Sequence, residues 1–569
     1  MEEKRVARGT KSEHGAVVLR AGTRELWLRK RGGPSFGDRT LRALIGQELD
    51  CEGTLAGPTL ILDRWKEVAM AKPAKARASG RASRAKKTRA RAVGKKLLAK
   101  TAAPLTDADK IRHVVLLMLE NRSFDQMLGG LQASIPAIDG VLPPGRSNSA
   151  GGIAFPQQPG AARKVDPDPQ HATPHVLRQL AGGNGGFAAD YAAAFPATSA
   201  SQRQQVMSYF ADGSLPALHA LARSFVVCDR WHSSVPGPTW TNRLFAMSGT
   251  SAGIVDMPSG PLDLGKHAYG QPSVFRRLAE AKRSYRIYFG DFPLALLLSD
   301  QRSPSSAKHF RPLDRFFADA AGDEKRFPDF AFLEPDYLWP GANDDHPPHD
   351  VAKGQKLIAR VYRALRANPA LWASTLLLVT YDEHGGFYDH IAPPPAPPPD
   401  GKHTEYSFDR LGVRVPAVLV SPWLASGVCH SAFDHTSLLR LLQRKWSLGS
   451  LGLRTAAAND PLHEVALLPA ARTDTPATLP VPAEKKVAAK GLAKAAAAPP
   501  LSDHQQAIVA LSQALAPSAA KAASKGAKGA KRAPSRAPKT SAPAPSAAAA
   551  ARSTHQRTVA FFKARGVKL

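Results

Sequence analysis

The sequence predicts an α/β domain whose mostly parallel sheet is covered by helices on both faces. Three short apolar runs, rich in branched residues, have the composition of strands that are buried on both sides. These runs span residues 112–119, 374–380 and 415–420. Helical segments alternate with them at residues 273–282, 354–367 and 436–446. Such alternation is typical of a parallel sheet, because parallel neighbours need a long crossover connection.

The rest of the chain differs in composition from this domain. Its 569 residues are too many for one compact core and suit one large domain with appendages. Apolar runs punctuated by Gly and Pro predict a small β-rich module first, and the Lys-, Arg- and Ala-rich stretch after it predicts a disordered linker. Low-complexity sequence after the domain contains one short predicted helix at 501–515. The predicted boundaries are 1–70 for the β-rich module, 71–105 for the basic linker, 106–470 for the main domain, 471–553 for the low-complexity segment and 554–569 for a C-terminal helix.

Positive charge is concentrated outside the main domain. The chain has 77 Lys and Arg residues against 47 Asp and Glu residues, which gives a net charge of +30. Residues 72–100 and 485–552 together carry +23 of this charge, so the remainder of the chain is close to ordinary. These basic stretches suit weak contact with a polyanion or an anionic membrane, and they equally suit plain solvated linkers.

Cysteine usage and hydropathy exclude several classes of protein. Cys51, Cys228 and Cys429 lie far apart, which argues against a disulfide framework and a cysteine zinc site and predicts free, buried thiols. No run approaches the roughly 18 apolar residues of a membrane span. The polar start has no hydrophobic stretch, so no secretory signal is expected, and export by another route leaves the compartment open.

Acidic and amide side chains directly follow two of the predicted strands. Glu120 and Asn121 come after the first run, and Asp382 and Glu383 come after the second. The carboxyl ends of parallel strands meet at one edge of a sheet, where ligands gather. Oxygen ligands of this type suit a divalent metal, although one acidic residue at a strand end is also a common helix N-cap. Two such sites together favour a metal whose identity the sequence leaves open.

A hydroxyl group is predicted at the start of a helix. Pro and Gly force a turn at 236–238, and residues 240–248 are predicted to be helical, so Thr239 lies at the N-terminus. Free backbone N–H groups there favour an anion such as phosphate, and a nearby metal would make the hydroxyl a nucleophile. The alternative for Thr239 is a simple N-cap.

Several histidines lie in loops that also contain Asp and Pro. His171, His346, His349 and His435 occur in such segments, and a rigid sheet concentrates functional side chains in its loops. Each could hold a phosphoryl oxygen or protonate a leaving group. Each could equally be a hydrogen-bonded structural histidine.

The motifs around these residues resemble a known family. They are IRHVVLLMLENRSFDQMLGG at 111–130, SSVPGPTWTNRLFAMSGTSAG at 233–253, NDDHPPHD at 343–350, TYDEHGGFYDHIAPP at 380–394 and VPAVLVSPWLASGVCHSAFDHTSLLRLL at 415–442. Five long motifs in this order resemble the bacterial phosphoesterases that include phosphatidylcholine-type phospholipases C and acid phosphatases. That family belongs to the alkaline-phosphatase-like superfamily.

The resemblance implies a role for each candidate residue. Glu120, Asn121, Asp382 and Glu383 are the expected metal ligands. Thr239 is the expected nucleophile and a further ligand, and threonine here leans towards the phospholipase C members. The phosphate-pocket histidines correspond best to His171 and His346, with His435 a weaker candidate. The implied reaction is hydrolysis of a phosphate ester, of which a phospholipid is one, through a covalent phosphothreonine.

A second function class remains open at this stage. The chain could be a nucleic-acid-binding protein that uses its basic stretches, with a secondary phosphoesterase domain. The intact set of Glu120, Asn121, Thr239, Asp382 and Glu383 argues against an inactive enzyme.

Overall fold

The structure is a computed structural model that contains two compact units, Met1–Thr101 and Ala102–Leu569. In the first unit it describes the backbone of five strands between residues 2 and 67. In the second it describes residues 110–258, 269–338, 340–402, 406–483, 500–516 and 546–569. The predicted linker 71–105 and most of the basic stretch 485–552 lie outside the described residues.

The first unit is a five-stranded sheet over the range predicted to be β-rich. Its strand order is β1-β2-β3-β5-β4, and only the β3–β5 pair is parallel. The strands are β1 (Glu2–Val6), β2 (His14–Ala21), β3 (Arg24–Lys30), β4 (Leu49–Ala56) and β5 (Thr59–Glu67).

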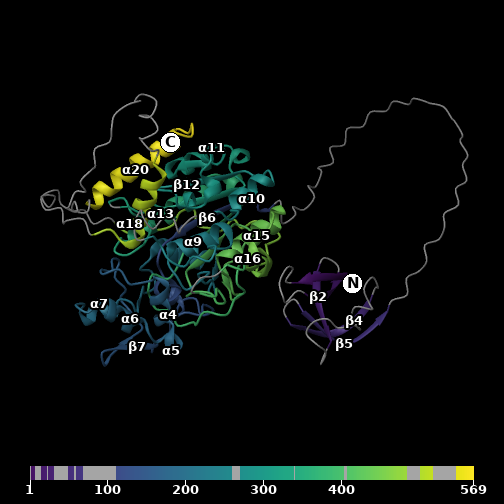
Figure 1. Cartoon of the computed structure of the whole chain (residues 1–569). Coiled ribbons are helices and arrows are strands. Elements are labelled where there is room, and N and C mark those ends of the chain that lie inside the picture. The colour runs from purple at the N-terminus through teal and green to yellow at the C-terminus, as the bar shows by residue number, and fades with distance from the viewer. Residues whose placement is uncertain are drawn as a thin grey trace, which may run out of the picture. The chain divides into compact units, whose positions relative to one another are not determined.

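The second unit is built on an eight-stranded sheet with the order β13-β12-β14-β6-β15-β16-β11-β17 (Figure 1). Its strands are β6 (His113–Leu119), β11 (Val226–Cys228), β12 (Tyr285–Phe289), β13 (Phe310–Pro312), β14 (Phe330–Glu334), β15 (Thr375–Tyr381), β16 (Ala417–Val420) and β17 (Gly427–Cys429). All neighbouring pairs are parallel except the two that β16 makes, with β15 and with β11. The mostly parallel sheet predicted from the sequence is confirmed, and the third apolar run is its antiparallel member.

Every residue of β6, β15 and β16 is buried, so both faces of the central sheet are covered. One group of helices contains α8, α12, α13 and α14, and the other contains α9, α10, α15 and α16. Their bounds are α8 (Pro216–Ser224), α9 (Thr239–Ser248), α10 (Val274–Glu280), α12 (Leu313–Ala320), α13 (Val351–Arg366), α14 (Pro369–Trp372), α15 (His435–Trp446) and α16 (Gly452–Ala457). None of the helices within the described ranges is long and apolar enough to cross a membrane.

A smaller layer of short elements lies between β6 and β11 in the sequence and has its own apolar cluster. It contains α3 (Phe124–Leu128), β7 (Ser147–Ala150), β8 (Ile153–Pro156), β9 (Gln158–Pro159), α4 (Thr173–Gln179), α5 (Ala181–Asn184), α6 (Phe187–Ala194), α7 (Ala200–Gln204) and β10 (Ser208–Tyr209). The loop between β9 and α4 carries His171.

Two C-terminal helices belong to the same compact unit as the sheet. They are α18 (Asp503–Leu515) and α20 (Ala547–Lys563), which pack against each other and appear together in yellow in Figure 1. Phe562 of α20 contacts the rings of Phe289 and Phe310, at centroid distances of 5.7 and 5.2 Å. Ile508 and Leu511 of α18 are buried in the main core. The compact unit therefore extends past the predicted domain end at residue 470 and includes both α18 and α20.

Candidate active site

Two neighbouring strands bring the predicted acidic ligands together. Leu119 at the end of β6 pairs with Tyr381 at the end of β15, so Glu120 and Asp382 leave the sheet side by side. The backbone N–H of Asn121 donates to Asp382 Oδ1 at 3.0 Å, which joins the two loops directly. The side chains of Glu120, Asn121, Asp382 and Glu383 are all fully buried.

The glycine after His384 allows this close approach. Gly385 has φ +63°, and a Cβ atom there would lie 2.3 Å from the carbonyl oxygen of Asn121. Asn121 itself has φ 59°, a left-handed conformation that is uncommon outside glycine and is often found at functional sites. The two motif loops are therefore shaped for contact with each other.

Thr239 lies at the first position of α9 and is fully buried. Its hydroxyl donates to Asn121 Oδ1 at 3.3 Å. The N-cap residue of α9 is Pro238, so Thr239 does not serve as the simple N-cap that the sequence left as an alternative. Its hydroxyl instead faces the strand ends at a helix N-terminus, where the dipole favours an anion.

Arg243 is a buried cation of the site that sequence reasoning missed. It lies one helical turn after Thr239, and a spacing of four residues on a helix was the signal that could have found it. Its Nη2 atom lies 2.9 Å from Glu120 Oε1, and its Nε atom lies 3.4 Å from Asp382 Oδ2. The positive charge of the guanidinium therefore neutralises part of the negative charge of Glu120 and Asp382.

The carboxylates keep free oxygen atoms that suit a divalent metal. Among the described residues, Glu120 Oε2 and Glu383 Oε1 are buried and have no hydrogen-bond partner. Burial, opposed by Arg243, raises the pKa of Glu120 well above its ordinary value, and burial raises the pKa of Glu383 to about 8. Buried carboxylates with open lone pairs are costly unless a cation occupies the site. The donor set fits a divalent ion with oxygen ligands.

Two of the three histidines that the resemblance assigns to the phosphate pocket lie beside this cluster. His171 and His346 are buried, and their rings meet edge to face at a centroid distance of 5.6 Å. The Nδ1 atoms bind the backbone oxygens of Pro169 and Pro347, at 2.9 and 2.6 Å, and among the described residues Nε2 of His346 has no hydrogen-bond partner. Nε2 of His171 lies 3.3 Å from the amide nitrogen of Asn121. With Asp168, these two histidines form a group whose ligand atoms lie within 4.8 Å of one another.

The third predicted histidine, His435, lies behind the acidic cluster. Its Nε2 atom bonds the backbone oxygen of Asp382 at 2.6 Å, and its Nδ1 atom accepts from Trp231 Nε1 at 3.3 Å. Because both nitrogens have partners, this geometry favours a role in holding the Asp382 backbone rather than contact with a substrate.

His504 of α18 is a further buried histidine of the site that the sequence did not single out. Its Nε2 atom lies 3.4 Å from Glu120 Oε1, and its ring stacks on that of His346 at 5.9 Å. The sequence predicted a helix at 501–515, but no local signal separates His504 from an ordinary surface histidine.

A large cavity opens onto these residues. Its volume is about 920 Å³, and Asp168 and His171 line it. Six large apolar side chains also line it. They are Leu177, Phe195, Ile254, Val255, Met257 and Leu501.

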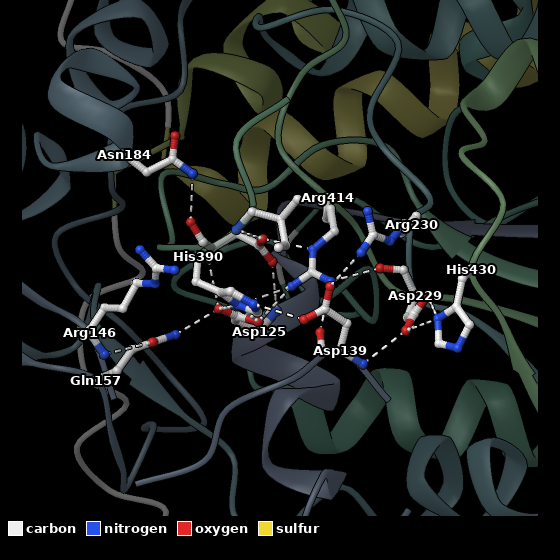
Figure 2. A network of polar contacts seen from close by, with 12 residues as sticks. Asp125, Asp139, Arg146, Gln157, Asn184, Asp229, Arg230, His390, Arg414 and His430 are labelled. Atoms are coloured by element: carbon white, nitrogen blue, oxygen red, sulfur yellow. Dashed lines mark hydrogen bonds and ion pairs between the residues drawn. The ribbon is translucent and has the colours of Figure 1, made fainter. Parts of the chain in front are cut away.

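A second polar cluster joins the motif at 111–130 to the motif at 380–394 (Figure 2). The guanidinium of Arg414 donates to Asp125 and Asp389, each at 2.8 Å, and it is fully buried. His390 adds a bond from Nδ1 to Asp125 at 2.8 Å and one from Nε2 to Asp139 at 3.1 Å. Asp125, Asp389 and His390 have the spacing of a metal group, but Arg414 already supplies the cation. This cluster therefore stabilises the loops that carry the acidic ligands.

We expect His390 to make stability depend on pH. It faces Asp125, Asp139, Asp389 and Arg414, and although burial lowers its pKa, bonding to Asp125 and nearby acidic charge raise it to about 8. The raised folded-state pKa stabilises the fold below about pH 6.5, and this contribution, about 2 kcal/mol, is lost as pH rises through about 8. Urea unfolding of wild type and His390→Gln from about pH 6 to pH 9 should show a steeper loss for wild type. Parallel curves for the two proteins would contradict this expectation.

Comparison with known proteins gives a consistent set of similarities. The family model described as Phosphoesterase family matches residues 111–449. Non-specific phospholipase C6 of Arabidopsis thaliana is 38% identical over 403 residues, which cover 65% of this chain and 75% of the relative. Phospholipase C A of Mycobacterium tuberculosis (strain CDC 1551 / Oshkosh) is 30% identical over 418 residues, with coverage of 62% and 78%. A solved protein in the alkaline phosphatase superfamily from Vibrio parahaemolyticus aligns with a TM-score of 0.28 at 12% identity, over 44% of this chain and 65% of that one.

Proposed function

The chain belongs to the phosphoesterase family and is a hydrolase of phosphoric esters, and on that premise we propose a metal-dependent phospholipase C with Thr239 as its nucleophile. One observation carries this proposal. The buried Thr239 hydroxyl, at the N-terminus of a ten-residue helix, bonds Asn121 beside carboxylates that keep free oxygen atoms.

The proposed ligands are Glu120, Asn121, Thr239, Asp382 and Glu383. A divalent ion held there supplies positive charge for the phosphoryl oxygens and lowers the pKa of the attacking hydroxyl. A neighbouring group, Asp168, His171 and His346, has the spacing of metal ligands and supports a metal in this part of the site, and its identity stays open.

The chain's own residues account for the remaining steps. Thr239 Oγ1 loses its proton and forms a bond to phosphorus while the bond from phosphorus to the alcohol oxygen breaks. The alcohol leaves with a proton on its oxygen, and a phosphothreonine remains. Water then breaks the phosphothreonine bond and restores the hydroxyl. The first backbone N–H groups of α9 are placed to hold phosphoryl oxygens. His171 and His346 share this role in their doubly protonated form, in which Nε2 donates as well as Nδ1. Positioning and charge stabilisation supply most of the catalysis in phosphoryl transfer.

The cavity favours a lipid leaving group over a small phosphomonoester. Its apolar side chains, Leu177, Phe195, Ile254 and Met257 among others, line the same cavity as His171. A phosphomonoester with a short polar alcohol has no use for such walls, whereas the acyl chains of a phospholipid gain free energy by covering them. The two relatives named above are phospholipases C.

A charge placed on the apolar wall tests the substrate class. Leu177 is 41% exposed and lines the cavity, so Leu177→Asp should leave the fold intact. We expect this variant to lower kcat/KM for phosphatidylcholine vesicles about tenfold and to change p-nitrophenyl phosphate hydrolysis less than about twofold. Leu453→Asp, at a 64% exposed leucine away from the cavity, is the matched control. Wild-type enzyme that hydrolyses only p-nitrophenyl phosphate would favour a phosphatase instead.

A further inference from the structure

His504 reaches the acidic cluster from outside the matched family domain. The family model ends at residue 449, and His504 is the second residue of α18. The ring is 1% exposed, and within the described residues neither of its nitrogens has a hydrogen-bond partner. A buried imidazole without partners is costly, which indicates a ligand that completes its bonding.

Packing holds the His504 ring in place. It stacks on His346 with an interplanar angle of 18°, and it meets the edge of Tyr337 at a centroid distance of 5.2 Å. The next residue, Gln505, donates to the backbone oxygen of Tyr337 at 2.8 Å and contacts His349 Nε2 at 3.1 Å. These bonds fix the start of α18 against the loop that carries His346, and the ring contacts with His346 and Tyr337 hold the imidazole beside Glu120.

The position of the ring relative to Glu120 fits a shared ion. His504 Nε2 lies 3.4 Å from Glu120 Oε1, an oxygen that Arg243 also contacts. Two ligands of one ion, each about 2.0–2.2 Å from it, lie about 3.0–3.5 Å apart in octahedral or tetrahedral geometry. A direct hydrogen bond between the two groups would be shorter and better aligned.

We propose that His504 is a nitrogen ligand of the divalent metal, supplied by the C-terminal helix α18. The inference rests on the proposed metal-dependent function, and it extends the ligand set beyond the five oxygen donors that the motifs provide. An imidazole ligand shifts preference from Ca²⁺ and Mg²⁺ towards Zn²⁺ and Fe²⁺. The helix that carries it would make the C-terminal segment a part of the catalytic centre.

The test replaces the ring nitrogens without creating a cavity. His504→Phe keeps a ring against His346 and Tyr337, and His504→Gln is the second variant if the first does not fold. His555→Phe, at an exposed histidine of α20, is the matched control. The readouts are the Zn²⁺ dissociation constant, measured by competition with a chromophoric chelator, and the directly bonded nitrogen signal in pulsed EPR of the Mn²⁺-loaded protein.

We expect His504→Phe to weaken Zn²⁺ binding about tenfold or more and to reduce the nitrogen signal, with no change in His555→Phe. Weaker binding with an unchanged nitrogen signal would mean that His504 only supports Glu120, and it would overturn the proposal. Unchanged binding together with an unchanged signal would also overturn it, while leaving the metal-dependent function standing. Wild-type protein that binds neither ion would instead contradict the proposed function itself.

Discussion

Thr239→Ala should abolish hydrolysis of both p-nitrophenyl phosphate and p-nitrophenyl phosphorylcholine. Removal of a nucleophile lowers kcat by about 10³-fold or more, because the substrate is still bound but no side chain attacks its phosphorus atom. The Thr239 hydroxyl makes a single 3.3 Å bond to Asn121, so the free energy of unfolding should change by only about 1 kcal/mol. The effect on turnover would therefore be chemical rather than structural.

Turnover by the wild type and the variant, each with and without a chelator, measures this effect. Thr239→Ser restores a hydroxyl and should recover part of the activity. Thr241→Ala is the matched control, because Thr241 is equally buried on α9 and, among the described residues, its hydroxyl has no hydrogen-bond partner. Turnover by Thr239→Ala above about a tenth of wild type would exclude Thr239 as the nucleophile. Turnover that resists chelator would exclude the metal.

Arg414→Leu should have the largest effect on stability. The change leaves Asp125 and Asp389 buried without their cation, and breaking a buried ion pair from one side costs about 3–5 kcal/mol. It also removes the bonds from Arg414 Nη1 to the backbone oxygens of Asp139 and Asp229, at 2.8 and 2.7 Å. Activity should fall as well, because the loops that carry Glu120 and Asp382 lose their common support.

Urea unfolding of the two proteins gives the difference in the free energy of unfolding. Arg230→Leu is the control, because Arg230 is 44% exposed and its 3.0 Å pair with Asp139 is worth about 1 kcal/mol or less. An Arg414→Leu variant as stable as Arg230→Leu would show that the cluster in Figure 2 contributes little to the fold.

The motifs at 111–130 and 380–394 each contain residues of the acidic cluster and residues that hold the loops together. The sequence revealed only the acidic residues. In ENRSFD, the first two residues face the acidic cluster, while Asp125 bonds Arg414 and His390 on the other side of the loop. Asp389 and His390 do the same for the second motif. A motif alone does not separate residues that contact a substrate from residues that hold the loop, because both lie in the same short stretch.

The sequence by itself predicted three strands of a mostly parallel sheet and the position of the acidic residues after two of them. Continuous apolar runs identify strands buried on both faces, and two such runs followed at once by Glu120–Asn121 and Asp382–Glu383 place four proposed ligands at one edge. It also identified Thr239 at the start of a helix. These features depend on residues close together in the chain, which local patterns describe well.

The tertiary structure alone decided which distant residues meet in the site and in the cluster that supports it. Arg414 meets Asp125 across 289 positions of the chain, and His504 meets Glu120 across a still longer separation. Packing between distant segments likewise sets the antiparallel direction of β16 and the docking of α18. No local sequence pattern in either segment indicates its partner. The free energy of the whole core determines which rings and ion pairs are buried together. The sequence therefore lists these residues without showing that they are in contact.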